Sequence, residues 1–196
     1  MKTSMKLFTL AASALISVSA LAQEGQPWIH DPSTIMECDG KYYTFGTGGG
    51  GLISEDGWNW FSGAVRPGGG AAPDAIKIGD RYLVAYSATG GGLGGGHAGR
   101  VLTMWNKTLD PNSPDFEYTE AIEVAASLLD EDCDAIDAGL FLDPTTGRLY
   151  CTYGTYFGFI RMVELDPKTG AKVEGTVDPN IAIDCEATTM IYNNGW

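Results

Sequence analysis

Apolar and polar residues alternate over short runs along most of the chain, and turns that contain glycine separate these runs. A unit recurs in which an acidic residue precedes an apolar run, a Gly or Asn-Gly turn and a second, aromatic run. Alternation between turn residues is typical of β-strands, and no sustained helical period interrupts it. The pattern therefore predicts an all-β protein.

The unit occurs four times, and its acidic residues are separated by 43, 63 and 49 residues. They are Asp31, Asp74, Asp137 and Glu186. The paired runs that follow them are 33–36 and 40–43, 75–78 and 79–86, 140–142 and 147–153, and 189–192 with the Asn193-Asn194-Gly195 turn. Further strands are expected at 51–54, 59–61, 100–105 and 159–165.

A spacing of roughly 40–50 residues is that of a β-propeller blade. The units predict about three blades and the opening strand of a fourth, with each carboxylate at one mouth of a central channel. A propeller closes with about four blades or more, so we expect the chain to be the N-terminal part of a longer protein. A complete β-sandwich is the alternative that the length allows.

Residues 1–22 have the features of a secretory signal peptide. Lys2 and Lys6 precede an apolar run from Leu7 to Leu21, and Ala20-Leu21-Ala22 matches the small-x-small pattern before a cleavage point. Serines dilute the run, which is too short for a typical membrane span. We therefore expect a secreted or periplasmic protein, with a mature body from residue 23 to residue 196.

The mature body is strongly acidic, because removal of Lys2 and Lys6 takes the formal charge from −13 to −15. Such a charge disfavours nucleic acids and anionic membranes as partners. Four cysteines remain, Cys38, Cys133, Cys151 and Cys185. Disulfides and buried free thiols are both compatible with this count, whereas the wide spacing disfavours a zinc or redox site.

Carboxylates gathered around a channel mouth suit glycoside hydrolysis, in which one acts as an acid and another as a base. Asp31 lies between His30 and Pro32 at the start of the first unit, and it is the first candidate for such chemistry. A solvated turn residue is the alternative for any single one of these acids.

Several motifs together resemble glycoside hydrolase family 43, in particular its arabinan endo-1,5-α-L-arabinosidases. The first unit carries Ile29-His30-Asp31-Pro32-Ser33, Tyr42-Tyr43-Thr44-Phe45-Gly46-Thr47-Gly48-Gly49-Gly50 and Ser54-Glu55-Asp56-Gly57-Trp58-Asn59-Trp60. The later units carry Ala72-Pro73-Asp74, Arg81-Tyr82-Leu83-Val84-Ala85-Tyr86-Ser87, Ala135-Ile136-Asp137, Leu140-Phe141-Leu142-Asp143 and Glu186-Ala187. The likeness covers almost the whole mature chain.

The resemblance implies a five-bladed propeller that hydrolyses O-glycosyl bonds of arabinan with inversion. It assigns Asp31 as the general base, Glu186 as the general acid, and Asp137 as the residue that tunes the pKa of the acid and orients it. It also implies that His30, Asp74, Ala135 and Ile136 lie at the substrate. Residues 23–196 would then be the incomplete N-terminal part of the propeller domain.

The resemblance names no metal ligand in this chain. No cofactor is expected to be required, and a structural calcium ion in the complete propeller would take ligands from outside this chain. The expected partner is an arabinan or arabinoxylan-type polysaccharide or oligosaccharide, bound by a protein that is monomeric when complete. A non-catalytic carbohydrate-binding propeller remains an alternative from another functional class.

Departures from the family pattern bear on the substrate. Ala71-Ala72 stands where the family often has tryptophan, Ala138 and Thr188 replace prolines, and Asp134 replaces asparagine. An exo-acting β-xylosidase or α-L-arabinofuranosidase is therefore the nearest alternative. The glycine-rich stretch 90–96 with His97 is interpreted as a loop over the channel mouth, and a plain connection without contact to substrate is the favoured alternative for it. Asn106-Lys107-Thr108 matches a glycosylation sequon.

Overall fold

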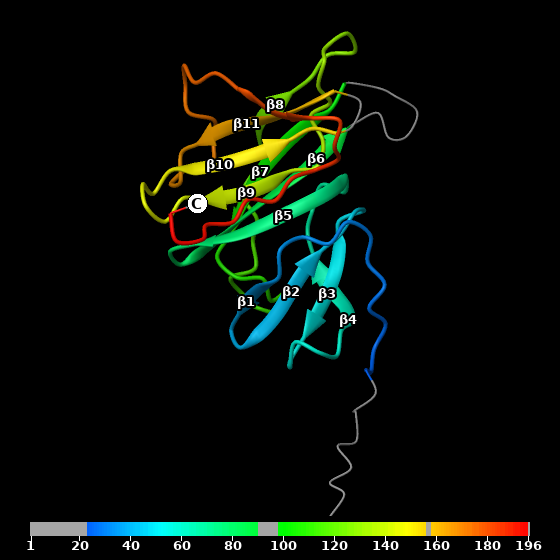
Figure 1. Ribbon diagram of the computed structural model, residues 1–196. Helices are drawn as coiled ribbons and strands as arrows, with labels where there is room; N and C mark the ends of the chain where they lie inside the picture. Colours follow the sequence, from blue (N-terminus) through cyan, green and yellow to red (C-terminus); the bar gives the residue numbers. More distant parts are fainter. Residues whose placement is uncertain (1–22, 90–97, 156–157, 196) are drawn as a thin grey trace, which may run out of the picture.

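A computed structural model describes residues 23–89, 98–155 and 158–195 of the chain, and within them every regular element is a β-strand (Figure 1). The signal peptide predicted at 1–22 and the loop with His97 lie outside the described residues. Twelve strands form three four-stranded sheets, and each sheet is a meander of consecutive antiparallel strands. The prediction of an all-β fold is confirmed. The strands form three separate meanders and not the two facing sheets of a β-sandwich, which was the alternative.

The three sheets follow one another along the chain. The first contains β1 (Met36–Cys38), β2 (Lys41–Phe45), β3 (Gly50–Ser54) and β4 (Phe61–Val65). The second contains β5 (Ala71–Ile78), β6 (Arg81–Thr89), β7 (Arg100–Asn106) and β8 (Ile122–Ala126). The third contains β9 (Gly139–Leu142), β10 (Leu149–Tyr153), β11 (Phe159–Leu165) and β12 (Asn180–Ile183).

Local sequence explains the first hairpin. Cys38 pairs with Lys41, which leaves Asp39 and Gly40 as a two-residue turn with φ angles of 51° and 75°. Two consecutive positive φ angles define the turn type that matches the natural twist of a hairpin, and Asp-Gly is among the sequences that adopt it most readily. The turn therefore fixes the register of β1 against β2.

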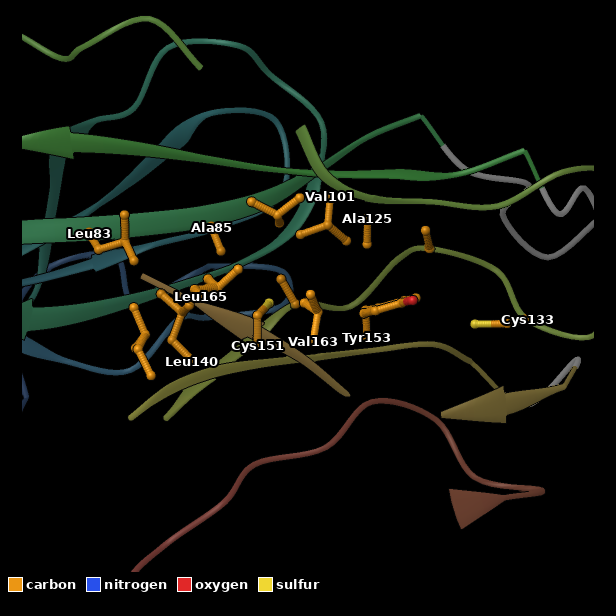
Figure 2. Close-up of a cluster of buried hydrophobic side chains, with 14 of the residues drawn as sticks. Leu83, Ala85, Val101, Ala125, Cys133, Leu140, Cys151, Tyr153, Val163 and Leu165 are labelled. Carbon is orange, nitrogen blue, oxygen red and sulfur yellow. The ribbon is translucent and has the colours of Figure 1, made fainter. Parts of the chain in front are cut away.

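Two apolar clusters hold the three sheets together, one on each side of the middle sheet. Tyr43 and Phe45 of the first sheet pack against Tyr82 and Val84 of β6 in one cluster. Figure 2 shows the other cluster, in which Leu83 and Ala85 of the same strand meet side chains of the third sheet. The labelled partners from the third sheet are Leu140, Cys151, Tyr153, Val163 and Leu165. Alternate residues of β6 thus point into two cores, as the two-residue period of a strand requires.

The first strands of the three sheets lie beside one another, with β5 between β1 and β9 (Figure 1). This arrangement resembles successive blades of a propeller, in which each inner strand borders the channel. The three described sheets do not close a ring. They correspond to the three units that the sequence predicts.

The strand predictions were wrong at five places. The strands expected at 33–36 and 59–61 each share only one residue with β1 and β4, which lie further along the chain. Strands β8 and β12 were not predicted, and both are outer strands of their sheets that pair on one side only. Residues 189–192 were expected to form a strand, but they adopt no regular structure, and among the described residues no strand pairs with them. A strand exists only where a neighbour accepts its hydrogen bonds, which the local sequence does not reveal.

The structure resolves two further alternatives. All four cysteines are free thiols, and three of them are buried: Cys38, Cys133 and Cys151. The side chain of Asn106 is also buried, with only 2% of the residue exposed. Its Oδ1 accepts hydrogen bonds from the backbone N–H groups of Thr108 and Glu117, so the sequon is inaccessible in the folded chain. Within the described residues, no helix is long and apolar enough to cross a membrane.

Candidate active site

A cavity of about 370 Å³ lies where the first strands of the three sheets begin. Four carboxylates line it, and they come from four separate parts of the chain: Asp31, Asp74, Asp137 and Glu186. The remaining lining residues are small or apolar, and include Pro32, Ala72, Pro73, Ala138 and Gly139. The four acids that open the sequence units are therefore brought together in space.

The four acids do not occupy equivalent backbone positions. The chain enters each unit through a residue with a left-handed backbone, and these residues are Asp31 (φ 49°), Ala72 (φ 40°), Asp137 (φ 59°) and Ala187 (φ 54°). Asp74 lies two residues after this position, and Glu186 lies one residue before it. The register of the sequence repeat was therefore wrong by two residues in the second unit and by one in the fourth.

A left-handed conformation is strained for residues other than glycine, and such strain is concentrated at functional sites. Aspartate tolerates this region better than alanine does, because its short polar side chain can form local hydrogen bonds. Asp31 and Asp137 both adopt this conformation, and both line the same cavity.

A short hydrogen-bond network orients Asp31. Its Oδ2 lies 2.6 Å from Nδ1 of His30 and accepts a hydrogen bond of 2.6 Å from the Thr47 hydroxyl. Thr47 is held in turn, because its Oγ1 accepts the Ala72 N–H at 3.0 Å and its own N–H donates to the His30 carbonyl. The His30 side chain is 81% exposed and that of Asp31 is 39% exposed. Asp31 lines the cavity, whereas His30 contacts Asp31 but is not part of the lining.

The carboxyl group of Asp137 has a raised pKa. Burial raises its pKa to about 6, and the charges of Glu186, Asp31 and Asp134 contribute in the same direction. The backbone N–H of Asp137 donates a 3.0 Å hydrogen bond to the buried hydroxyl of Ser87 on β6. The second sheet therefore holds the backbone of Asp137 in place.

Glu186 reaches the cavity from an exposed segment. Two residues later, the Thr188 carbonyl accepts a hydrogen bond from the Thr152 hydroxyl on β10. A Cβ atom at Gly139 on β9 would lie 2.3 Å from the same carbonyl oxygen, so the glycine allows the segment to approach β9 closely. This close packing places Glu186 beside the Asp137 carboxylate.

The other predicted substrate residues differ in their placement. Asp74 lines the cavity but is only 8% exposed. Ala135 does not lie on the cavity, because it is fully buried in the core between the second and third sheets. Ile136 is half-buried and also lies outside the lining, and its carbonyl accepts the Gly154 N–H. The sequence adjacency of Ala135 and Ile136 to Asp137 does not bring their side chains to the cavity.

Sequence reasoning missed Thr47 and Ser87. Thr47 lies just after β2, and Ser87 lies near the end of β6. Each hydroxyl accepts the N–H of the left-handed residue that opens the next unit, Ala72 and Asp137 respectively. A small hydroxyl residue near the end of the aromatic strand in two successive units was the available signal. Its meaning depends on contacts between sheets, which one sequence does not show.

The described residues contain no group of three or more His, Cys, Asp or Glu side chains that could hold a metal ion. The cavity provides two solvent-accessible carboxylates, Asp31 and Glu186, and the half-buried carboxyl group of Asp137, whose raised pKa means that it retains its proton more readily than usual. Such a set can give a proton to one oxygen and take a proton from another, which is general acid and base catalysis.

Comparison with curated proteins finds arabinan-degrading enzymes. The chain is 30% identical over 177 residues to the probable arabinan endo-1,5-α-L-arabinosidase A of Aspergillus flavus, covering 82% of this chain and 51% of that protein. It is 29% identical over 175 residues to an extracellular exo-α-(1→5)-L-arabinofuranosidase of Cellvibrio japonicus, covering 80% of this chain and 49% of that protein. The chain thus spans about half the length of these relatives. No family model matches the chain.

The similar solved structures are also arabinanases. An exo-1,5-α-L-arabinanase from a bovine ruminal metagenomic library is 28% identical, with a TM-score of 0.67 over 79% of this chain and 54% of that one. A family 43 endo-arabinanase from Bacillus licheniformis is 24% identical, with a TM-score of 0.76 over 88% and 64%. An α-L-arabinanase of Cellvibrio cellulosa in complex with arabinohexaose is 22% identical, with a TM-score of 0.68 over 79% and 53%.

Proposed function

Given that this chain is an arabinanase-like protein of glycoside hydrolase family 43, we propose that the complete protein hydrolyses α-1,5-L-arabinofuranosidic bonds in arabinan. The observation that carries the proposal is the cavity that gathers Asp31, Asp137 and Glu186, with the pKa of Asp137 raised to about 6. These are the three carboxylates to which the family resemblance assigns catalytic roles.

In the proposed reaction, Glu186 donates a proton to the oxygen of the leaving sugar as the bond from C1 to that oxygen breaks. A water molecule attacks C1 from the opposite face, and Asp31 accepts a proton from that water. One water is consumed, and the configuration at C1 is inverted. Inversion requires room for a water molecule between acid and base. Both residues line an open cavity of about 370 Å³, and this supports the assignment.

Asp137 is assigned the role of tuning and orienting the acid. Asp137 and Glu186 repel each other when both are ionised, which contributes to the raised pKa of Asp137. Below about pH 6 a proton is therefore retained within this group of acids. His30 and Thr47 keep the Asp31 carboxylate directed toward the cavity.

Several features support arabinan as the substrate. The acidic body is compatible with a neutral polysaccharide, although it does not itself point to one. Both curated relatives are named for activity on α-1,5-linked arabinose, and one solved neighbour is a complex with arabinohexaose. We propose that the complete protein is a secreted or periplasmic monomer and that it contains a five-bladed propeller. Calcium in that propeller stays an expectation.

Glu186→Gln in the complete protein tests the proposal, because it removes the acid while preserving size and hydrogen-bonding capacity. We expect release of reducing ends from linear arabinan to fall by about 10²- to 10⁴-fold, with arabinohexaose affinity by calorimetry within about threefold. Glu174→Gln, on an exposed loop, is the matched control. Unchanged turnover in Glu186→Gln would contradict the assignment. A wild-type protein that binds arabinohexaose without hydrolysing it would favour the non-catalytic binding propeller.

A further inference from the structure

The Asp74 carboxylate, on the second sheet, forms hydrogen bonds to the first sheet's leading segment and to the third sheet. Its Oδ1 accepts the backbone N–H of Thr34 at 2.9 Å, and its Oδ2 accepts the backbone N–H of Leu140 at 2.7 Å. Thr34 precedes β1 of the first sheet, and Leu140 lies on β9 of the third sheet. Asp74 itself lies on β5, which lies between β1 and β9 (Figure 1). One carboxylate therefore holds a segment on each side of its own strand.

The two N–H groups lie at matching places relative to the active-site carboxylates. Thr34 is three residues after Asp31, and Leu140 is three residues after Asp137. Asp31 and Asp137 are in turn the left-handed residues that open their units. Each oxygen of Asp74 therefore holds the segment just behind one of these carboxylates.

Burial makes these two hydrogen bonds strong. Asp74 is 8% exposed, and hydrogen bonds to an ionised acceptor are about twice as strong as bonds between neutral groups. The first strand of a sheet has no neighbour on its inner side, so the N–H groups that face this side need another acceptor. Asp74 supplies that acceptor for both flanking segments at once.

We propose that Asp74 is a positioning residue that sets the separation between Asp31 and Asp137 in the reaction. The proposal rests on the proposed function. Asp74 is only 8% exposed and each of its oxygens accepts a backbone N–H, so we assign its effect to the two segments it holds rather than to contact with the sugar. A displacement of about 1 Å between reacting groups can cost about 10²-fold in rate, so a single clamp between them has a large effect.

Asp74→Asn in the complete protein tests this role. The amide retains one acceptor oxygen but directs an NH₂ group at the other backbone N–H, so one of the two hydrogen bonds is lost. We expect kcat on linear arabinan to fall about 10- to 100-fold, with KM within about threefold of wild type. Asp80→Asn, an identical change in the exposed turn of the same hairpin, is expected to leave kcat unchanged.

Asp74→Glu is the second variant, because it keeps the buried charge and lengthens the side chain by one methylene. We expect this variant to melt cooperatively and to lose kcat at nearly constant KM. Wild-type kcat in either folded variant overturns the proposal. An increase in KM with kcat unchanged also overturns it and assigns Asp74 to substrate binding instead.

The remaining outcomes are also decisive. Failure of both variants to melt cooperatively assigns Asp74 to folding alone and overturns the proposal. Absence of arabinan turnover in the wild-type protein contradicts the proposed function itself. An active wild-type protein whose Asp74 variants are equally active contradicts only the role proposed for Asp74.

Discussion

The Thr47 hydroxyl donates a hydrogen bond of 2.6 Å to Oδ2 of Asp31, across sixteen residues of sequence. The same oxygen of Thr47 accepts the N–H of Ala72, the left-handed residue that opens the second sheet. The carboxylate proposed as the base is thus held by a side chain that is itself fixed to the neighbouring sheet. The position of the Asp31 carboxylate therefore depends on both the first and the second sheet.

Thr47→Val should reduce kcat by about 10-fold, because valine keeps the shape of threonine but cannot donate to the Asp31 carboxylate. Thr47→Ser, which retains the hydroxyl, should restore most of the rate. Steady-state kinetics on linear arabinan, with thermal melts of both variants, make the measurement. Equal kcat in the valine and serine variants would show that the hydroxyl does not orient Asp31.

Asp137→Asn should change the pH dependence of stability. The pKa of Asp137 is raised from 3.8 to about 6 in the folded chain, so the folded state binds more protons than the unfolded state between these values. Its ionisation therefore lowers stability as pH rises from about 4 to about 6. Asparagine cannot ionise, and it tolerates the left-handed backbone at φ 59°.

Relative to wild type, Asp137→Asn should gain about 1–2 kcal/mol in unfolding free energy on going from pH 4 to pH 7, a figure reduced to allow for partial solvent exposure. Urea unfolding at the two pH values measures this difference, and Asp80→Asn serves as the control. Activity should fall in Asp137→Asn at every pH. Parallel stability profiles for Asp137→Asn and wild type would refute the assignment of the raised pKa.

Gly170→Ala should destabilise the contact between the second and third sheets. Gly170 has φ 76°, and an added Cβ would lie 2.8 Å from Leu83 Cδ1 and 2.9 Å from Trp105 Nε1. Gly175→Ala is the matched control, because Gly175 has φ 78° with nothing within 4 Å of the added atom. Both variants carry the cost of a left-handed alanine, about 1–2 kcal/mol.

The crowding at Gly170 should add about 1–3 kcal/mol to that cost, as measured by urea unfolding. The turn that contains Gly170 is closely held, since the Thr103 hydroxyl donates to the Gly170 carbonyl and Trp105 Nε1 donates to the Thr169 carbonyl. Equal losses in the two glycine variants would mean that this turn does not pack on the second sheet as described.

The buried cysteines should be unreactive in the native protein. Burial raises the pKa of Cys133 to about 11 and that of Cys151 to about 12, and Cys38 is also buried. The thiolate is the reactive form, so iodoacetamide at pH 8 should modify these three residues only after denaturation. Mass spectrometry of the native protein should show no disulfide among the four cysteines. Rapid native alkylation of any of the three would contradict their burial.

The sequence predicted the strands that carry strong local signals. The aromatic strands β2, β6 and β10 each follow a turn that contains glycine, and each lies close to its expected bounds. Strands β8 and β12 lack such signals, because an outer strand is defined by pairing on one side. Residues 189–192 have the composition of a strand but no partner among the described residues.

The sequence predicted which acidic residues form the candidate site better than it predicted their geometry. Asp31, Asp74, Asp137 and Glu186 converge as the repeat suggested, whereas their offsets from the left-handed position did not follow from the spacing. The roles of Thr47 and Ser87 depend on hydrogen bonds between sheets, and Ala135 shows that a residue beside the site in sequence can be part of the core.

The anomeric configuration of the first product tests the central claim most directly. The complete protein is mixed with linear α-1,5-arabinan, and proton NMR spectra are recorded before mutarotation. Hydrolysis between Asp31 and Glu186 by one displacement predicts that the β-anomer of the new reducing end appears first. The α-anomer first, or no new reducing end, would contradict it.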